Sequence, residues 1–294
     1  MARGGSQPPS RPARPPRTPP PRPGAGKARR APRSELRSRV LVAIPAVVFA
    51  VLAVSAGGPV FALVATVLGL VCLHELFGMY SRARPIRLAG MLVLVALAAA
   101  AHLGGERQVL LVLVAALPLI FLVGLTMRHV ERLAPSVALT LLGVAWIGLP
   151  IAHVVMLREL PHGDAIIVDV LVGTFVGDTG AYLGGRAFGT RRLAPRISPN
   201  KTVEGLVIGM LAAVIATWCA GLYQDWLGHG EALLLGLAVA VAAPIGDLFE
   251  SKVKRDAGVK DSGSLFRAHG GALDRLDAAL FAVVAGYYVW IALL

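Results

Sequence analysis

Residues 108–126 read QVLLVLVAALPLIFLVGLT and contain no charged side chain. A helix of about twenty apolar residues matches the thickness of a bilayer core, and similar runs recur along the chain after residue 38. Of the 294 residues, 56% are hydrophobic and 16% are charged, whereas a soluble domain carries about 25% charged residues. This composition excludes a soluble domain and predicts an all-α fold, a polytopic transmembrane helical bundle.

Nine segments are long and apolar enough to be predicted as spans: 40–57, 59–80, 88–104, 108–126, 136–157, 165–185, 203–223, 231–249 and 272–294. Lys and Arg residues in short loops stay on the cytoplasmic side of a membrane. With the amino terminus inside, 26 Lys and Arg residues fall on the inner side and two, Arg107 and Arg158, on the outer side. The sequence therefore predicts about nine spans and a cytoplasmic amino terminus.

Residues 1–38 form a separate, basic segment. They hold ten Lys or Arg, ten Pro and one acid, Glu35. Because the segment has almost no large apolar residue, it cannot bury enough apolar surface to offset the entropy lost on ordering. It also lacks the apolar core that a secretory signal would have. We predict a disordered, Pro/Arg-rich cytoplasmic tail. Contact with anionic lipid headgroups is favoured over the alternative of a nucleic-acid arm, so no nucleic-acid partner is expected.

The rest of the chain divides by its polar content. Residues 39–164 are predicted to form amino-terminal transmembrane helices with few polar residues, and residues 165–294 a carboxy-terminal transmembrane catalytic region with loops at the cytoplasmic face. Cys72 and Cys219 lie within apolar runs and lack a CxxC partner, so neither a disulfide framework nor a zinc site is predicted.

Acidic residues inside apolar segments are costly and need a reason. Glu75 is isolated, and its sequence context is equally consistent with a structural polar residue whose hydrogen bonds are satisfied and with a functional residue. Asp247 and Glu250 are three residues apart, as are Asp274 and Asp277, so each pair shares a helical face. Both pairs flank one cytoplasmic loop, where their oxygens would suit Mg²⁺ shared with substrate phosphates. The alternative is a surface ion network neutralised by Lys252, Lys254 and Arg275.

The residues of two predicted cytoplasmic loops favour phosphate binding over a surface ion network. Residues 251–271 contain five Lys or Arg residues, and Gly270 and Gly271 directly precede a predicted helix, whose free amides could face an anion. In the preceding loop, Ser198 and Pro199 predict a helix start. Lys201 and Thr202 would then project from its first turn towards a phosphate. Cations and a metal around phosphates are the chemistry of phosphoryl or nucleotidyl transfer.

At residues 251–277 the chain resembles the phosphatidate cytidylyltransferase, or CDP-diacylglycerol synthase, family. The family motif is matched by Ser251, Val253, Lys254, Arg255, Lys260, Asp261, Gly263, Phe266, His269, Gly270, Gly271, Asp274, Arg275, Leu276 and Asp277. Residues 178–189 and 198–205 resemble a second conserved region, so that the resemblance covers roughly 40–294. Arg267 and Ala272 depart from the family pattern beside the His-Gly-Gly turn.

The resemblance implies that CTP and phosphatidic acid react to CDP-diacylglycerol and pyrophosphate, in phospholipid biosynthesis at the cytoplasmic face of the plasma membrane. It implies Mg²⁺, and it suggests a monovalent cation such as K⁺ beside it. The expected partners are CTP, phosphatidic acid and the lipid bilayer, with a homodimer as an alternative to a monomer. A secondary transporter would show related halves and broken mid-membrane helices, and a CDP-alcohol phosphotransferase would show Asp-Gly pairs that the sequence lacks. A lipid kinase, which would keep the same metal and nucleotide chemistry, stays among the alternatives.

The resemblance also assigns roles. The expected metal ligands are Asp247 and Asp274, with Asp277 and Asp178 as further candidates and Glu250 as a neighbouring acid. The expected catalytic contacts, besides Asp247 and Asp274, are Lys254, Arg255, Lys260, Asp261 and His269. The expected substrate-binding residues are Ser198, Lys201, Thr202, Glu204, Lys252, Gly270, Gly271 and Arg275.

Overall fold

Long apolar helices dominate the part of the chain that the computed structural model describes, which is Met1 and residues 49–127, 132–263 and 270–294. The helices are α2 (Gly58–Met79), α3 (Arg87–Gly104), α4 (Glu106–Thr126), α5 (Leu133–Gly143), α6 (Leu149–Glu159), α7 (Gly163–Phe188), α8 (Val203–Gly221), α9 (His229–Asp256) and α10 (Leu273–Leu293). A π-helical turn, Val144–Gly148, joins α5 to α6, and a short 3-10 turn, Ser81–Ala83, follows α2.

Eight helices in these described ranges are long and apolar enough to cross a membrane, with α5 and α6 counted as one span, Leu133–Glu159. They correspond to the second to ninth predicted spans, so the predicted polytopic helical bundle is confirmed. The predicted tail, 1–38, lies outside the described residues except for Met1, and the predicted first span, 40–57, does so for most of its length; residues 49–55 are helical. From residue 49 onward, the described residues belong to one unit, Val47–Leu294.

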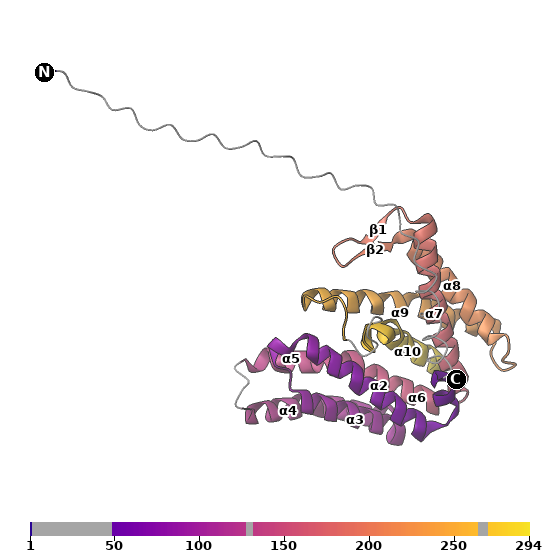
Figure 1. The fold of residues 1–294 in the computed structure, drawn as a ribbon. Helices are drawn as coiled ribbons and strands as arrows, with labels where there is room; N and C mark the ends of the chain where they lie inside the picture. The colour runs from indigo at the N-terminus through magenta and orange to yellow at the C-terminus, as the bar shows by residue number, and fades with distance from the viewer. Residues whose placement is uncertain (2–48, 128–131, 264–269) are drawn as a thin grey trace. The chain divides into compact units, whose positions relative to one another are not determined.

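Within this unit, α10 is the central helix for the site. It contacts α6 and α2 on one side and α7 and α9 on the other, and Figure 1 shows α9 and α10 between the α2–α6 group and the α7–α8 pair. The span Leu133–Glu159 is mostly buried, whereas α4 and α8 leave most of their surface exposed, as expected of helices that face lipid. The carboxy-terminal helices are therefore packed against a buried helical support.

Helices α7 and α8 pack closely along their length (Figure 1). Glycines make this approach possible: a Cβ atom on Gly209 would lie 2.8 Å from the carbonyl oxygen of Gly177 and 2.6 Å from the Cβ of Ala181. Small residues of this kind let membrane helices approach at the backbone. The α7–α8 pair is consequently a rigid support for the hairpin that connects its two helices.

That hairpin corrects one sequence prediction. Strand β1 (Arg192–Ala194) pairs antiparallel with β2 (Ser198–Thr202), so Ser198 and Pro199 do not start the next helix. Helix α8 begins at Val203, and Thr202 is its N-cap, because the Thr202 hydroxyl accepts a hydrogen bond from the Gly205 amide at 3.1 Å. Both Ser and Thr are good N-caps, and the pairing with β1 decides between them. Lys201 and Thr202 therefore lie on a strand.

Candidate active site

Lys254, near the end of α9, joins the two predicted acid pairs. Its ammonium lies 2.5 Å from Oε2 of Glu250, one turn earlier on α9, and 2.7 Å from Oδ1 of Asp274 on α10. The Glu250 side chain is buried, and its Oε1 accepts no hydrogen bond from the described residues. The convergence of the carboxyl end of α9 and the amino end of α10, predicted from the spacing of the acids, is thus present in the structure.

Asp274 has a second set of partners besides Lys254. Its carboxylate accepts hydrogen bonds from the Ser262 amide, at 3.0 Å and 3.1 Å to the two oxygens, and from the Gly271 amide at 2.8 Å. Both oxygens are therefore committed to N–H donors. In this arrangement Asp274 fixes the segments on either side of residues 264–269, which differs from the metal-ligand role expected of it.

A second charged group consists of residues from the hairpin, α7, α9 and α10. Lys201 of β2 forms an ion pair with Asp247 of α9. Asp178 of α7 interacts electrostatically with Asp247, Asp277 and Lys201, and Asp277 of α10 interacts with Asp247. The three carboxylates come from three helices and repel one another, and this repulsion favours a cation near them.

The oxygen donors of this group fit the chemistry of Mg²⁺, a hard cation that binds through one or two carboxylates together with substrate phosphates. Among the described residues, no group of three or more His, Cys, Asp or Glu side chains is close enough together to hold a metal ion. The binding of Mg²⁺ by Asp247, with Asp178 and Asp277 as further ligands, therefore stays a prediction.

The amides at the start of α10 are occupied, contrary to the prediction for Gly271. Its N–H donates to Asp274, and the next two amides, of Ala272 and Leu273, donate to Glu75 at 3.0 Å and 2.9 Å. The expectation of open amides is therefore wrong for Gly271: protein carboxylates satisfy the N-terminal donors that a free helix end would offer. Gly270 has a positive φ of 82°, which suits the turn before the helix.

Several predicted site residues have partners within the chain. Glu204 accepts hydrogen bonds from the amides of Thr190 and Arg191 and from the Thr190 hydroxyl, so it holds the end of the α7–β1 connection. Arg255 donates from Nε to the Ile197 carbonyl at 3.3 Å and ties the hairpin to α9. Lys252 is paired with Asp256 on the exposed side of α9.

The remaining predicted residues are placed as follows. Lys260 and Asp261 are exposed in the segment after α9, Arg275 is exposed on the first turn of α10, and Ser198 lies half-buried on β2. His269, together with Arg267, lies outside the described residues. Ala272, the other departure from the family motif, is buried.

Two residues near the end of α2 contribute to the site region and were not predicted to do so. Glu75 accepts hydrogen bonds at the start of α10, and the Tyr80 hydroxyl donates to the Val253 carbonyl of α9 at 2.9 Å. Burial, with a smaller contribution from Asp256, raises the pKa of the Tyr80 hydroxyl and keeps it a donor. The isolated acid in an apolar segment was a signal for Glu75, but its partners are almost 200 residues away.

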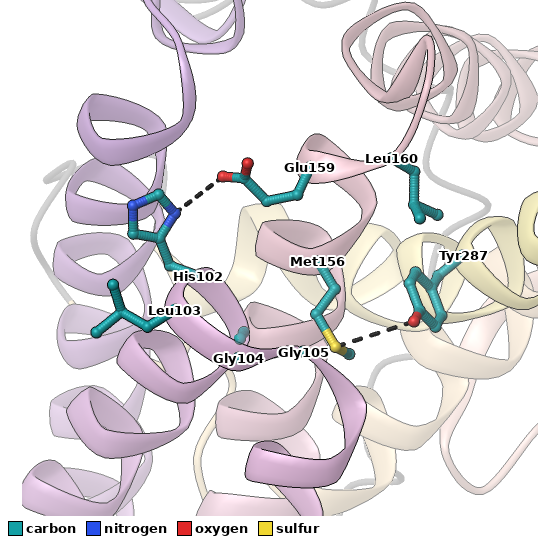
Figure 2. A pocket seen from close by; sticks show the side chains of 9 residues that line it. His102, Leu103, Gly104, Gly105, Met156, Glu159, Leu160 and Tyr287 are labelled. Carbon is teal, nitrogen blue, oxygen red and sulfur yellow. Dashed lines mark hydrogen bonds and ion pairs between the residues drawn. The ribbon is translucent and has the colours of Figure 1, made fainter.

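A pocket of about 400 Å³ lies at the opposite end of the helices, between the α3–α4 turn, α6 and α10. Figure 2 shows His102 directed towards Glu159, and Met156 next to Tyr287. Tyr287 is thirteen residues after Asp274, about 20 Å of helical rise. None of the residues lining this pocket is a predicted site residue, so it is separate from the charged groups on α9 and α10.

The fold and the charged groups define a class: an integral-membrane helical protein with interacting carboxylates and lysines in its carboxy-terminal helices and hairpin. The chain belongs to the cytidylyltransferase family, whose model matches residues 37–293.

Curated relatives include three of similar identity. A phosphatidate cytidylyltransferase of Pseudomonas aeruginosa is 43% identical over 152 residues, 50% of this chain and 54% of the relative. A phosphatidate cytidylyltransferase of Bacillus subtilis is 39% identical over 150 residues, which are 50% of this chain and 56% of the relative. The uncharacterized protein YnbB of Escherichia coli is 38% identical over 143 residues, which are 47% of this chain and 48% of the relative. The chain therefore spans about half the length of the relatives it matches.

Proposed function

We propose that this protein is a phosphatidate cytidylyltransferase, which transfers CMP from CTP to phosphatidic acid and releases pyrophosphate. The observation that carries the proposal is the Lys201–Asp247 ion pair together with the repulsion among Asp247, Asp178 and Asp277, which lie in the second halves of α9 and α7 and in the second turn of α10. Membership of the cytidylyltransferase family and the relatives named phosphatidate cytidylyltransferase support it. The active site would lie at the cytoplasmic face of the plasma membrane, because the predicted inner loops carry most of the basic residues.

The proposed reaction requires that the two substrates be positioned together and that the negative charge on their phosphates be neutralised. A phosphomonoester is already ionised near neutral pH, so its oxygen can attack the α-phosphorus of CTP without a strong general base. The P–O bond to the β-phosphate breaks, and pyrophosphate leaves with the electron pair. Cationic side chains that hold both polyanions reduce the entropic cost of their meeting and stabilise the developing charge.

We assign these tasks to residues on the two charged groups. Lys201 and Lys254 would contact phosphate oxygens, with Arg255, Lys260 and His269 as further cations along the same segment. Mg²⁺, held by Asp247 with Asp178 and Asp277, would supply charge neutralisation on the triphosphate. Asp274 would position Lys254 and the segment that contains Ser262. A monovalent cation and a homodimer stay predictions.

The test is pyrophosphate release by the purified protein in detergent, with CTP, phosphatidic acid and Mg²⁺ supplied together and each omitted in turn. Release that requires all three is the expected result, and chelation of Mg²⁺ should abolish it. Pyrophosphate release with ATP but not CTP would indicate a different nucleotidyl transfer, whereas formation of ADP without pyrophosphate would indicate a lipid kinase. Absence of release with any nucleotide and lipid would contradict the proposal.

A further inference from the structure

Glu75 connects the amino-terminal helices to the start of α10. Its carboxylate on α2 is buried, with 8% of the residue exposed. It accepts hydrogen bonds from the Ser262 hydroxyl at 3.0 Å, the Ala272 amide at 3.0 Å and the Leu273 amide at 2.9 Å. A buried carboxylate is retained only where such donors compensate its lost hydration, and here all three donors come from the two segments that flank residues 264–269.

Two glycines fit closely around this carboxylate. A Cβ atom on Gly263 would lie 2.5 Å from Oε1 of Glu75, and one on Gly271 would meet both Glu75 and the Ser262 hydroxyl. Neither collision could be relieved without moving Glu75 away from its backbone partners. The absence of side chains at Gly263 and Gly271 is therefore explained by the presence of Glu75 between them.

Glu75 and Asp274 hold the same two segments through different atoms. Ser262 donates its hydroxyl hydrogen to Glu75 and its amide hydrogen to Asp274. At the start of α10, Gly271 donates to Asp274, and the next two amides donate to Glu75. Asp274 in turn binds Lys254. A shift in the contacts of Glu75 would thus be transmitted to the Asp274–Lys254 pair.

We infer that Glu75 is a positioning residue for this site: from α2 it holds the Ser262–Gly263 segment and the first turn of α10 where Asp274 can orient Lys254. The inference rests on the proposed function, because it assigns Lys254 to the phosphates. Glu75 itself touches no reacting atom. Its loss should lower the fraction of molecules in the productive arrangement, and so reduce kcat more than KM.

The test compares Glu75→Gln with Glu75→Asp and with a matched control, Glu106→Gln. Gln keeps the size of the side chain, but its amide group is a donor facing donors, whereas Asp keeps the charge. Glu106 also contacts α10, through the Tyr287 hydroxyl at 2.9 Å, but at the end remote from Asp274. Hydrogen exchange of peptides covering residues 259–275, thermal unfolding and steady-state kinetics are measured on the full chain in detergent.

For Glu75→Gln we expect amide exchange at Ala272 and Leu273 to accelerate about tenfold or more, while exchange in the helix interiors stays unchanged. We expect kcat to fall about tenfold or more, with KM for phosphatidic acid within about threefold. Glu75→Asp should recover part of both losses, and Glu106→Gln should change neither quantity. If Glu75→Gln fails to fold, Ser262→Ala removes one of the contacts and should produce a smaller change in the same directions.

Exchange at wild-type rates, or faster exchange with normal kcat, would overturn the positioning role. Faster exchange throughout the protein, with a lower unfolding midpoint, would show general destabilisation and would also overturn it. The exchange measurement needs no substrate, so it tests the Glu75 contacts even if pyrophosphate release fails. An inactive wild-type protein with accelerated exchange in Glu75→Gln would refute the proposed function while retaining the structural contact.

Discussion

At the scale of single residues, the charges of the site are neutralised in pairs that differ in their surroundings. Lys201 and Asp247 are partly exposed, whereas the Glu250 partner of Lys254 is almost fully buried. An exposed pair is cheaply rearranged, because solvent and added ions can replace either partner. Under the proposed function, Asp247 would exchange Lys201 for the metal ion, and the released Lys201 would contact a nucleotide phosphate.

Replacing Asp247 with Asn should abolish most activity by removing the charge that would hold Mg²⁺. We expect kcat/KM for CTP to fall about 100-fold or more, and the Mg²⁺ concentration for half-maximal rate to rise. The measurement is pyrophosphate release over a series of Mg²⁺ concentrations. Asp164→Asn, an exposed replacement in the first turn of α7 at the other end of that helix, serves as control. Unchanged Mg²⁺ dependence would contradict the assignment of Asp247.

Replacing Asp274 with Asn should also remove turnover, for a different reason. The Asn side chain cannot accept from Lys254 and from the amides of Ser262 and Gly271 as a carboxylate does. We expect kcat to fall about 100-fold, with the protein still inserted in the membrane and its Mg²⁺ requirement little changed. Rates of release and membrane yield are measured together. Near-normal kcat would refute a role for Asp274 in orienting Lys254.

At the scale of elements, the α7–α8 pair determines where the hairpin and Lys201 lie. Its helices are joined by the β1–β2 hairpin, whose start Glu204 holds, and are packed through glycines along their shared face. Packing through small residues replaces the hydrophobic effect, which is absent between helices in lipid. A change in this packing should therefore affect both stability and the placement of β2.

Gly209→Ala tests this packing. The added Cβ would meet the Gly177 carbonyl oxygen and Ala181 from α7, and overpacking of this kind costs about 1–3 kcal/mol. We expect a lower thermal midpoint in detergent. Gly78→Ala is the matched control, because a Cβ at Gly78 on α2 meets nothing within 4 Å and Ala is the better helix former. An equal midpoint for the two variants would contradict close backbone packing of α7 with α8.

At the scale of the whole molecule, the described connections fall at two ends of the spans. The α2–α3 connection, the hairpin and the segment after α9 follow spans that run one way, and the turns at Gly105, 160–162 and 222–228 follow those that run the other way. At the second end, His162 stacks on Trp226 with ring centroids 4.0 Å apart, and Trp226 lies edge-on to Trp290. Aromatic residues of this kind are enriched at membrane interfaces.

Orientation can be tested with single cysteines in a Cys72→Ser, Cys219→Ser variant. Pro195, exposed in the hairpin, and Asp225, exposed between α8 and α9, are replaced by Cys one at a time. In sealed inverted membrane vesicles, an impermeant thiol reagent should label the cysteine at position 195 and not that at position 225. In right-side-out vesicles the pattern should be reversed. The opposite result would place the charged site outside the cytoplasm.

The basic tail should be dispensable for catalysis, since none of the site residues lies before residue 47. Deletion of residues 1–37 is expected to leave kcat within about threefold of the full chain in detergent. The assay is pyrophosphate release at saturating CTP and phosphatidic acid. A truncated protein that is folded but inactive would show that the tail takes part in the reaction.

The sequence by itself determined the class of fold and the segments that carry the chemistry. Apolar runs such as 108–126 match the bilayer thickness, and this property is local, so α4 and the other spans could be predicted without knowledge of their neighbours. The spacing of Asp247 with Glu250 and of Asp274 with Asp277 likewise follows from helical periodicity. The motif in residues 251–277 predicted the family that the match over 37–293 confirms.

The tertiary structure alone decided which charges meet. Strand pairing with β1 moved the start of α8 from Ser198 to Val203. The amides at the start of α10, expected to face an anion, are bound by Glu75 and Asp274. Glu75 lies almost 200 residues before its partners, and no local pattern specifies a contact at that separation. Such contacts arise only when packed helices bring a buried carboxylate to the donors that can compensate its desolvation.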